Sequence, residues 1–308
     1  MQAIQPRTIG TGPASGIFGV KESGTENRAT VPMLLRKLRP LLRCPQCHAA
    51  LGIAGSELHC DAGHAFPVED RIPRLARYAM AEGRNPGRID VPTSLDYQAR
   101  YRQYEAARRY NEAYRDKPTK RWSTVRELAL LGRLFDSQPH CRTLLDIPCG
   151  GGRLSEAIAS ATTTLIEADT GLGQLLYARE QSPVRSSRLW MTASAFHIPF
   201  ADESIDAVVC IRLCHHLPTQ AEREHLLAEL LRVARRYVVM TFFDYHSPKN
   251  LLRRLRAPFN NKPPKLTMTR QRVAEVAAAH GAKLVTAPAL AWQSSGHRYA
   301  LLVKSEPG

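Results

Sequence analysis

The sequence lacks the apolar run of roughly 20 residues that a transmembrane helix needs. Its first thirty residues also lack the continuous apolar stretch of a secretory signal. Acidic residues are few, with 28 Asp and Glu against 43 Lys and Arg, so the 308-residue chain has a net charge of +15. The missing apolar run argues against an integral membrane protein, and the net charge favours anionic partners. The scattered cysteines described next indicate a reduced, cytoplasmic setting.

Cysteine is also scarce, and its arrangement argues against a disulfide framework. The number of cysteines is odd, at seven, and four of them are scattered through apolar or loop segments. The other three form, with one histidine, a Cys-x2-Cys pair and a Cys-x3-His pair at the spacing of a zinc ribbon. Four such ligands complete the tetrahedral coordination of one Zn²⁺ ion and leave no position open for substrate, so we expect a structural zinc site. The expected ligands are Cys44, Cys47, Cys60 and His64.

Composition divides the chain into four parts. Residues 1–30 are rich in Gly, Ser, Thr and Pro and are expected to form a disordered tail. Residues 31–78 contain the expected zinc-ribbon module. Residues 79–118 combine a linker with a helix that Pro118 is expected to end. Residues 119–308 are long enough for a complete α/β domain.

In this last part, short β-rich segments alternate with helical patterns, which predicts a parallel sheet covered by helices on both faces. The final two strands are joined by a short loop without a helix, so the last strand should run antiparallel to its neighbour. The seven expected strands are 143–148, 163–169, 188–194, 204–211, 236–243, 282–290 and 298–305. The expected helices include 153–161, 171–181, 219–235 and 268–281.

Three consecutive glycines follow the first of these strands, in LLDIPCGGGRLSEAIA. The strand ends at Asp146, and the glycines permit positive φ and close approach of a ligand to the backbone. The next strand ends at Asp169, where a carboxylate is placed to accept both hydroxyls of a ribose. The pattern predicts a nucleoside site. The G-x-G-x-x-G fingerprint is absent, which disfavours a dinucleotide such as NAD.

Four segments resemble, in order and spacing, the motifs of class I S-adenosylmethionine-dependent methyltransferases. They are LLDIPCGGGRL, IEADTGLGQLLYAR, AFHIPFADESIDAVVCIRLCHHL and LLRVARRYVVMTFF. The resemblance covers about residues 120–308. It implies a Rossmann-like seven-stranded sheet, S-adenosylmethionine as the cofactor, and methyl transfer as the activity. Two positions depart from the family pattern, because Pro148 replaces the first loop glycine and Ser194 replaces an acid that often binds the adenine.

The resemblance also implies which residues contact the cofactor. Asp146 and the glycine loop would hold the methionine end, and Asp169 would bind the ribose hydroxyls. Gly151 would be the variable position of the loop. The full set of implied contacts is Asp146, Cys149, Gly150, Gly152, Asp169, Gly171, Leu172, Ala195, Phe196 and Ile211.

Methyl transfer requires a nucleophile in line with the sulfonium carbon, and a general base only where that nucleophile carries a proton. His215 and His216 follow the fourth strand and Asp244 follows the fifth, at the sheet edge where ligands bind in such folds. We take these three residues as candidate catalytic groups, with packing as the alternative role of the histidines. No N-P-P-Y or D-P-P-Y tetrapeptide follows the fourth strand, which disfavours amino-methylation of DNA, of some RNA and of protein glutamine.

The sequence leaves two classes of methyl acceptor open, a small molecule or lipid and an RNA. The zinc segment resembles both small zinc-ribbon activators of methyltransferases and the zinc module of rRNA guanine-N1 methyltransferases. The basic segment 247–265 lies where small-molecule enzymes of this family carry a lid, and it suits either an anionic lipid or RNA. We expect a small-molecule or lipid-like acceptor, with rRNA or tRNA as the alternative and a non-catalytic scaffold as a third reading. The sequence carries no signal for an oligomeric state.

Overall fold

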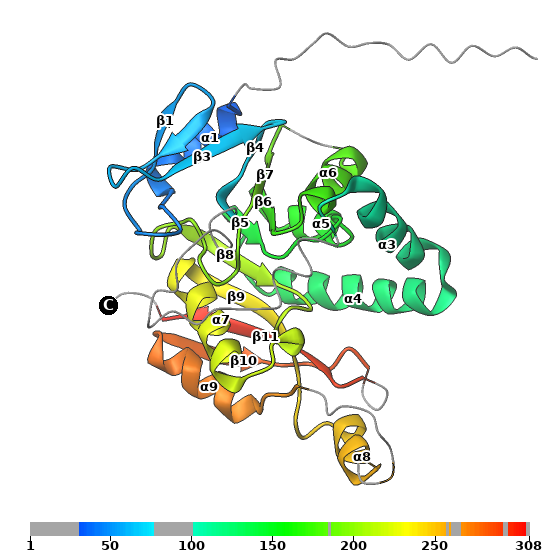
Figure 1. Cartoon of the computed structure of the whole chain (residues 1–308). Coiled ribbons are helices and arrows are strands. Elements are labelled where there is room, and N and C mark those ends of the chain that lie inside the picture. Colours follow the sequence, from blue (N-terminus) through cyan, green and yellow to red (C-terminus); the bar gives the residue numbers. More distant parts are fainter. Residues whose placement is uncertain are drawn as a thin grey trace, which may run out of the picture.

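The computed structural model describes residues 31–76, 101–183, 186–256, 259, 266–291 and 295–305. The predicted tail, residues 77 and 78 of the predicted zinc module, and most of the predicted linker lie outside the described residues. The described part contains a four-stranded and a seven-stranded sheet with helices packed around them (Figure 1). Within these residues, no helix combines the length and the apolar character needed to cross a membrane.

The seven-stranded sheet has the order β10-β11-β9-β8-β5-β6-β7. Its central strands are parallel, whereas β11 is antiparallel to both of its neighbours. Each strand overlaps a predicted segment, so the Rossmann-like α/β fold is confirmed. The strands are β5 (Cys141–Asp146), β6 (Thr162–Asp169), β7 (Arg188–Thr192), β8 (Ile205–Cys210), β9 (Ala234–Phe243), β10 (Ala282–Thr286) and β11 (His297–Lys304).

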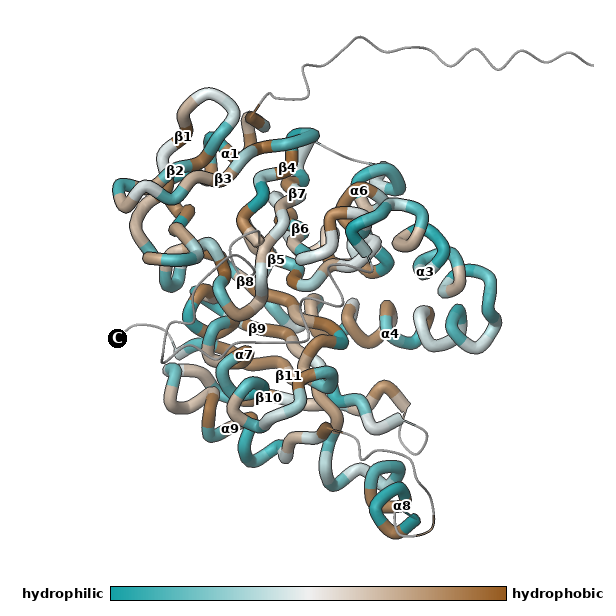
Figure 2. Tube along the Cα trace, viewed as in Figure 1, coloured by the Kyte–Doolittle hydropathy of each residue, from teal (hydrophilic) through white to brown (hydrophobic). Residues whose placement is uncertain are grey.

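Successive residues of the central strands pack into two different cores, one on each face of the sheet. Figure 2 shows how strongly hydrophobic β8 and β9 are at the centre of the molecule. Leu145, Val208 and Val238 contribute to the core under α7 (Gln220–Val233) and α9 (Arg270–Ala279). Their neighbours Leu144, Val209 and Val239 contribute to the other core, with α4 (Pro118–Asp136) and α5 (Ser155–Ala159). Both faces are thus covered, as the alternating pattern predicts.

The helical region before the sheet differs from the prediction at Pro118. A helix, α3 (Tyr104–Asp116), does end just before this proline, but Pro118 itself begins α4. Proline is well tolerated there because the first turn of a helix has no use for its missing N–H. The second half of α4 buries Leu130, Leu131 and Phe135 against the sheet. Helix α4 was not predicted from the sequence.

The four-stranded sheet at the N-terminal end is joined to the large sheet along the β7 edge. It consists of β1 (Gly52–Ala54), β2 (Glu57–His59), β3 (Ala65–Glu69) and β4 (Ile72–Pro73), and follows α1 (Met33–Leu38) and η1 (Arg39–Leu41). Leu42 forms a bridge with Phe200, and Arg74 forms a parallel bridge with Thr192 of β7. Leu42 and Phe200 are both fully buried in one core that extends across the two sheets. The N-terminal module therefore shares its core with the large domain.

Candidate active site

A cavity of about 700 Å³ lies at the carboxyl ends of β5, β6, β7 and β8. This volume is in the range of pockets that hold drug-sized ligands. Gly152, Gly171 and Leu172 do not line it, although the sequence analysis placed them in contact with the cofactor. Seven of the ten predicted cofactor residues do line it, namely Asp146, Cys149, Gly150, Asp169, Ala195, Phe196 and Ile211.

The fully buried carboxylate of Asp169 fixes the backbone at one end of this cavity. Its Oδ2 atom accepts a hydrogen bond from the amide of Gly150 at 2.9 Å, and its Oδ1 atom accepts one from the amide of Gly171 at 2.7 Å. Asp169 thus connects the glycine loop to the start of α6 (Leu172–Gln181). Gly171 does not line the cavity, but its amide orients the Asp169 carboxylate.

Two of the loop glycines are required for different physical reasons. Gly150 has φ of 56°, a backbone conformation that favours glycine. At Gly151, a Cβ atom would lie 2.2 Å from the side-chain nitrogen of Asn111 on α3. That amide is held in place because it donates to Gln174 at 2.7 Å. The position assigned as variable in the sequence analysis is therefore closely packed in this chain.

Three buried acids, Asp146, Glu167 and Asp169, gather near the glycine loop, and Asp146 and Asp169 line the cavity. Burial, and then the charges of Glu167 and Asp169, raise the pKa of Asp146 well above its usual value. Glu167 accepts a hydrogen bond from Ser155 and is paired with Arg188 at 3.7 Å. Carboxylates so placed favour a ligand that brings hydroxyl donors or positive charge.

Aromatic rings form the opposite end of the cavity. His215 and His216, both predicted, lie in η3 (Cys214–His216) and line the cavity together with His297, which was not predicted. The ring of His215 is 4.3 Å from that of His216 and 4.9 Å from that of His297, measured between centroids. Burial and the charge of Arg212 lower the pKa of His297 to about 4, so this imidazole is neutral at neutral pH.

The third catalytic candidate, Asp244, is not among the residues that line the cavity. Its carboxylate is buried, forms an ion pair with Arg298 at 2.9 Å, and accepts a hydrogen bond from the amide of His246 at 3.0 Å. These contacts give Asp244 a structural role at the end of β9.

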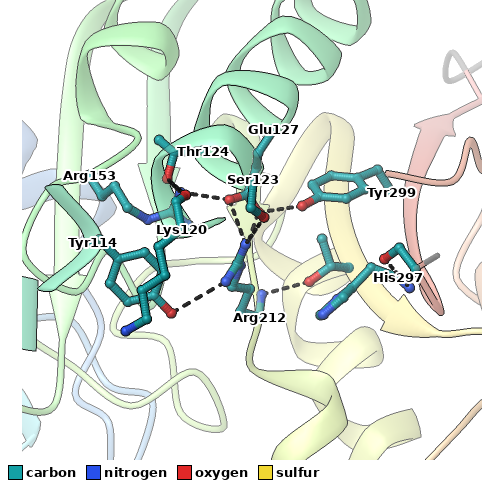
Figure 3. Close-up of polar contacts among 11 residues, drawn as sticks. Tyr114, Lys120, Ser123, Thr124, Glu127, Arg153, Arg212, His297 and Tyr299 are labelled. Atoms are coloured by element: carbon teal, nitrogen blue, oxygen red, sulfur yellow. Dashed lines mark hydrogen bonds and ion pairs between the residues drawn. The ribbon is translucent and has the colours of Figure 1, made fainter. Parts of the chain in front are cut away.

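A buried carboxylate on α4, Glu127, supports the histidine end of the cavity (Figure 3). Arg212 donates to it from Nε at 3.1 Å and from Nη2 at 2.9 Å, and Arg153 approaches it to 2.7 Å. The Tyr299 hydroxyl also donates to Glu127. Burial alone would raise the pKa of Glu127, but the charges of Arg153 and Arg212 hold it below its usual value.

Helix α3 supplies tyrosines to the same region of the cavity. Tyr110 and Tyr114 line it, with their ring centroids 5.5 Å apart. The Tyr114 hydroxyl accepts a hydrogen bond from Nη1 of Arg212 at 3.4 Å, and the Lys120 ammonium lies 4.1 Å from the centre of the Tyr114 ring. A phenol surrounded by cations is well suited to bind a polar ligand group by its hydroxyl.

The four predicted metal ligands come together in the N-terminal module, away from the cavity. Their ligand atoms all lie within 4.8 Å of one another. The Sγ atoms of Cys47 and Cys60 are 3.7 Å apart, and Nδ1 of His64 is 3.3 Å from Sγ of Cys60 and 3.5 Å from Sγ of Cys44. A tetrahedral zinc ion with ordinary bond lengths requires separations of about 3.8 Å between sulfurs and about 3.6 Å between sulfur and nitrogen. The donor set and its spacing fit zinc.

The class of protein follows from the sheet order, the antiparallel β11 and the position of the cavity. This is the Rossmann-like α/β fold of methyltransferases. Residues 145–241 match the family described as "Methyltransferase domain". The matched part of the chain, from the end of β5 through most of β9, is therefore similar to a methyltransferase domain.

Similar proteins come from several organisms. A ubiquinone biosynthesis O-methyltransferase of Hydrogenovibrio crunogenus is 29% identical over 93 residues, 30% of this chain and 39% of that protein. Methyltransferase GfsG of Streptomyces halstedii is 33% identical over 98 residues, 30% of this chain and 34% of that protein. The chain thus matches less than half the length of these curated relatives.

Two solved structures share the fold at low sequence identity. Magnesium protoporphyrin IX methyltransferase of Synechocystis superposes with a TM-score of 0.57 and 15% identity, covering 68% of this chain and 99% of that chain. A complex of the Haloferax volcanii Trm112 methyltransferase activator with a putative methyltransferase gives a TM-score of 0.51 and 13% identity, with the same coverage. At these identities the likeness establishes the fold.

We predict that Glu127→Gln lowers the free energy of unfolding by about 3–5 kcal/mol at neutral pH, because it leaves Arg153 and Arg212 without their common carboxylate. Since folding lowers the pKa of Glu127 below 4.5, its contribution is fully present above that pH and is lost as the pH falls further. Urea unfolding at neutral and acidic pH measures both effects.

The variant should therefore lose less stability than the wild type on acidification. Glu57→Gln, at an exposed position of β2, is the matched control and should behave as the wild type. A Glu127→Gln protein as stable as the wild type at neutral pH would contradict this role of the buried carboxylate.

Proposed function

We propose that the chain is an S-adenosylmethionine-dependent methyltransferase acting on a small-molecule or lipid-like acceptor. The observation that carries this proposal is the cavity itself. One end presents buried acids and a glycine loop, and the other presents histidines, tyrosines and an arginine. Direct methyl transfer requires that the cofactor and the acceptor meet in one cavity, and both groups of side chains line the same one.

The acidic end would hold the cofactor. Asp169 lines the cavity, and each of its oxygens accepts a backbone hydrogen bond and would accept a ribose hydroxyl with its remaining lone pair. Asp146 and the amides around Gly150 would bind the methionine portion, and Ala195 and Phe196 would flank the adenine. When bound, S-adenosylmethionine would supply an electrophilic methyl group, and its positive charge would favour the ionised form of Asp146, whose pKa burial and neighbouring acids raise.

The histidine end would hold the acceptor. Positioning and exclusion of water by His215, His216, Tyr110 and Tyr114 would account for much of the rate. An acceptor hydroxyl requires a base, and we assign that task to the η3 histidines, because both line the cavity. We do not retain Asp244 as a base, since its carboxylate is held by Arg298.

The names of similar proteins also support a small-molecule acceptor. The relatives named above include enzymes of ubiquinone and protoporphyrin methylation, which act on small molecules. The alternative of an RNA acceptor rests on the net charge of +15 and on the zinc module. That module packs its apolar residues into the core of the large domain, which favours stabilisation of the enzyme as its task.

The cofactor assignment predicts a large effect of Asp169→Ala. Loss of two hydrogen bonds to a charged group should weaken S-adenosylmethionine binding by about 100-fold or more in isothermal titration. Asp136→Ala, at the exposed end of α4, is the matched control. Circular dichroism checks that both variants are folded. Unchanged affinity in a folded Asp169→Ala protein would place the ribose elsewhere.

For the N-terminal cluster we propose a structural zinc ion held by Cys44, Cys47, Cys60 and His64. The purified chain should contain one equivalent of zinc by mass spectrometry, and chelation should lower its thermal stability. Cys47→Ser should lose the metal, whereas Cys149→Ala, in the glycine loop, should retain it. Zinc content near background in the wild-type protein would refute this assignment.

The acceptor class is tested by transfer of tritium from labelled S-adenosylmethionine into fractionated cell extract. We expect the label in the lipid or small-molecule pool, and none with Asp169→Ala. Label in the RNA pool would replace our proposal with the RNA alternative. No transfer to any pool by a protein that binds the cofactor would favour a non-catalytic scaffold.

A further inference from the structure

Helix α8 (Pro248–Arg256) exposes its apolar side chains. Its sequence, PKNLLRRLR, has three leucines, four basic residues and no acid. Leu251, Leu252 and Leu255 are 48%, 46% and 64% exposed, and Phe259 beyond the helix is 88% exposed. The leucines of α7, by contrast, are buried in the core. In the described part of the chain, five of the ten exposed large hydrophobic side chains lie between residues 245 and 259.

Asn250 determines which face of α8 is turned outward. It is only 2% exposed, and its side-chain amide donates to the carbonyl oxygen of Asp244 at 2.8 Å. It also packs against Gly296, where a Cβ atom would lie 2.7 Å from the Asn250 amide nitrogen. Helical spacing puts Leu252 nearly opposite Asn250, with Leu251 and Leu255 beside it. The leucines therefore point away from the molecule, from which α8 projects (Figure 1).

Basic residues flank this apolar face on both sides. By helical spacing, Lys249, Arg253 and Arg256 follow Leu252 around the helix, and Arg254 lies on the other side, next to Leu251. The Arg254 guanidinium stacks over the Tyr245 ring at 3.8 Å. Figure 2 shows this alternation of hydrophilic and hydrophobic residues along α8. Such a helix is complementary to a surface that is anionic outside and apolar just beneath.

We propose that α8 docks on an anionic phospholipid surface, with its leucines among the acyl chains and its cations at the level of the headgroups. A membrane interface accommodates both properties of the helix, because it attracts basic residues and buries an apolar face lying in its plane. A nucleic acid would match the charge alone, since phosphate binding makes no use of exposed leucines.

The position of α8 connects this surface to the histidine end of the cavity. The helix follows β9, whose last residue, Phe243, packs against the rings of His215 and His297 at 4.5 and 4.3 Å. Asp244, the next residue, holds Asn250 of α8. Docking would bring the acceptor end of the cavity toward the lipid surface, as a lipid-like acceptor requires. The docking itself does not depend on methyl transfer.

Flotation of the full chain with lipid vesicles tests the proposal. Wild-type protein should bind vesicles of phosphatidylcholine with phosphatidylglycerol at least about tenfold more tightly than pure phosphatidylcholine. Leu251→Gln with Leu255→Gln should weaken that binding about tenfold or more. Arg253→Glu with Arg256→Glu should do the same.

Two matched controls separate α8 from general effects. Val285→Gln changes an exposed apolar residue of β10, and Arg133→Glu with Arg142→Glu changes two exposed arginines elsewhere. Both should bind vesicles as the wild type does. Vesicle binding that survives the leucine changes, or binding of ribosomal RNA without any binding of vesicles, would overturn the proposal. Titration with S-adenosylmethionine on the same variants keeps this result separate from the methyltransferase assignment.

Discussion

A single buried carboxylate holds the histidine end of the cavity together. Glu127 is contacted by Arg153 after the glycine loop, Arg212 after β8, and Tyr299 of β11, so it joins four segments distant in sequence. Arg212 has φ of 66°, which costs energy in a non-glycine residue. Its ion pair with Glu127 and the 2.6 Å hydrogen bond from its amide to Thr241 offset that cost. The position of Arg212, and with it that of Tyr114, depends on this network.

At the acidic end, backbone hydrogen bonds rather than ion pairs hold the key carboxylate, Asp169. Asp169 accepts two backbone hydrogen bonds, so the carboxylate and the glycine loop fix one another before any ligand arrives. For Asp146, burial together with two nearby acids outweighs the charge of Arg153 and raises the pKa. The cavity thus has carboxylates at one end and arginines near the other. This difference would orient a cationic cofactor toward the carboxylates and leave the other end for a polar acceptor.

Local patterns predicted much of this arrangement. Asp146 and Asp169 end recognisable strands, and the four zinc-type ligands lie in two short pairs, so spacing alone brought them together. Tyr114 and His297, which line the cavity, and Glu127, which holds Arg212 beside it, were missed because they come from helices and a strand whose packing is set by distant contacts. The insertion of β11 between β9 and β10, and the shared core of the N-terminal module, also depend on long-range pairing. Arg212 lies between Ile211 and His215, in the segment after the fourth strand that the family resemblance places at the methyl-transfer face, so the sequence did indicate its position.

The central claim is that one cavity holds the cofactor at its acidic end and the acceptor at its histidine end. A crystal structure with S-adenosylhomocysteine tests it most directly. The account predicts the ribose hydroxyls within hydrogen-bonding distance of Asp169, the adenine beside Phe196, and the sulfur directed toward His215 and His216. A ligand bound elsewhere, or bound in this cavity with its adenine among the histidines, would contradict it.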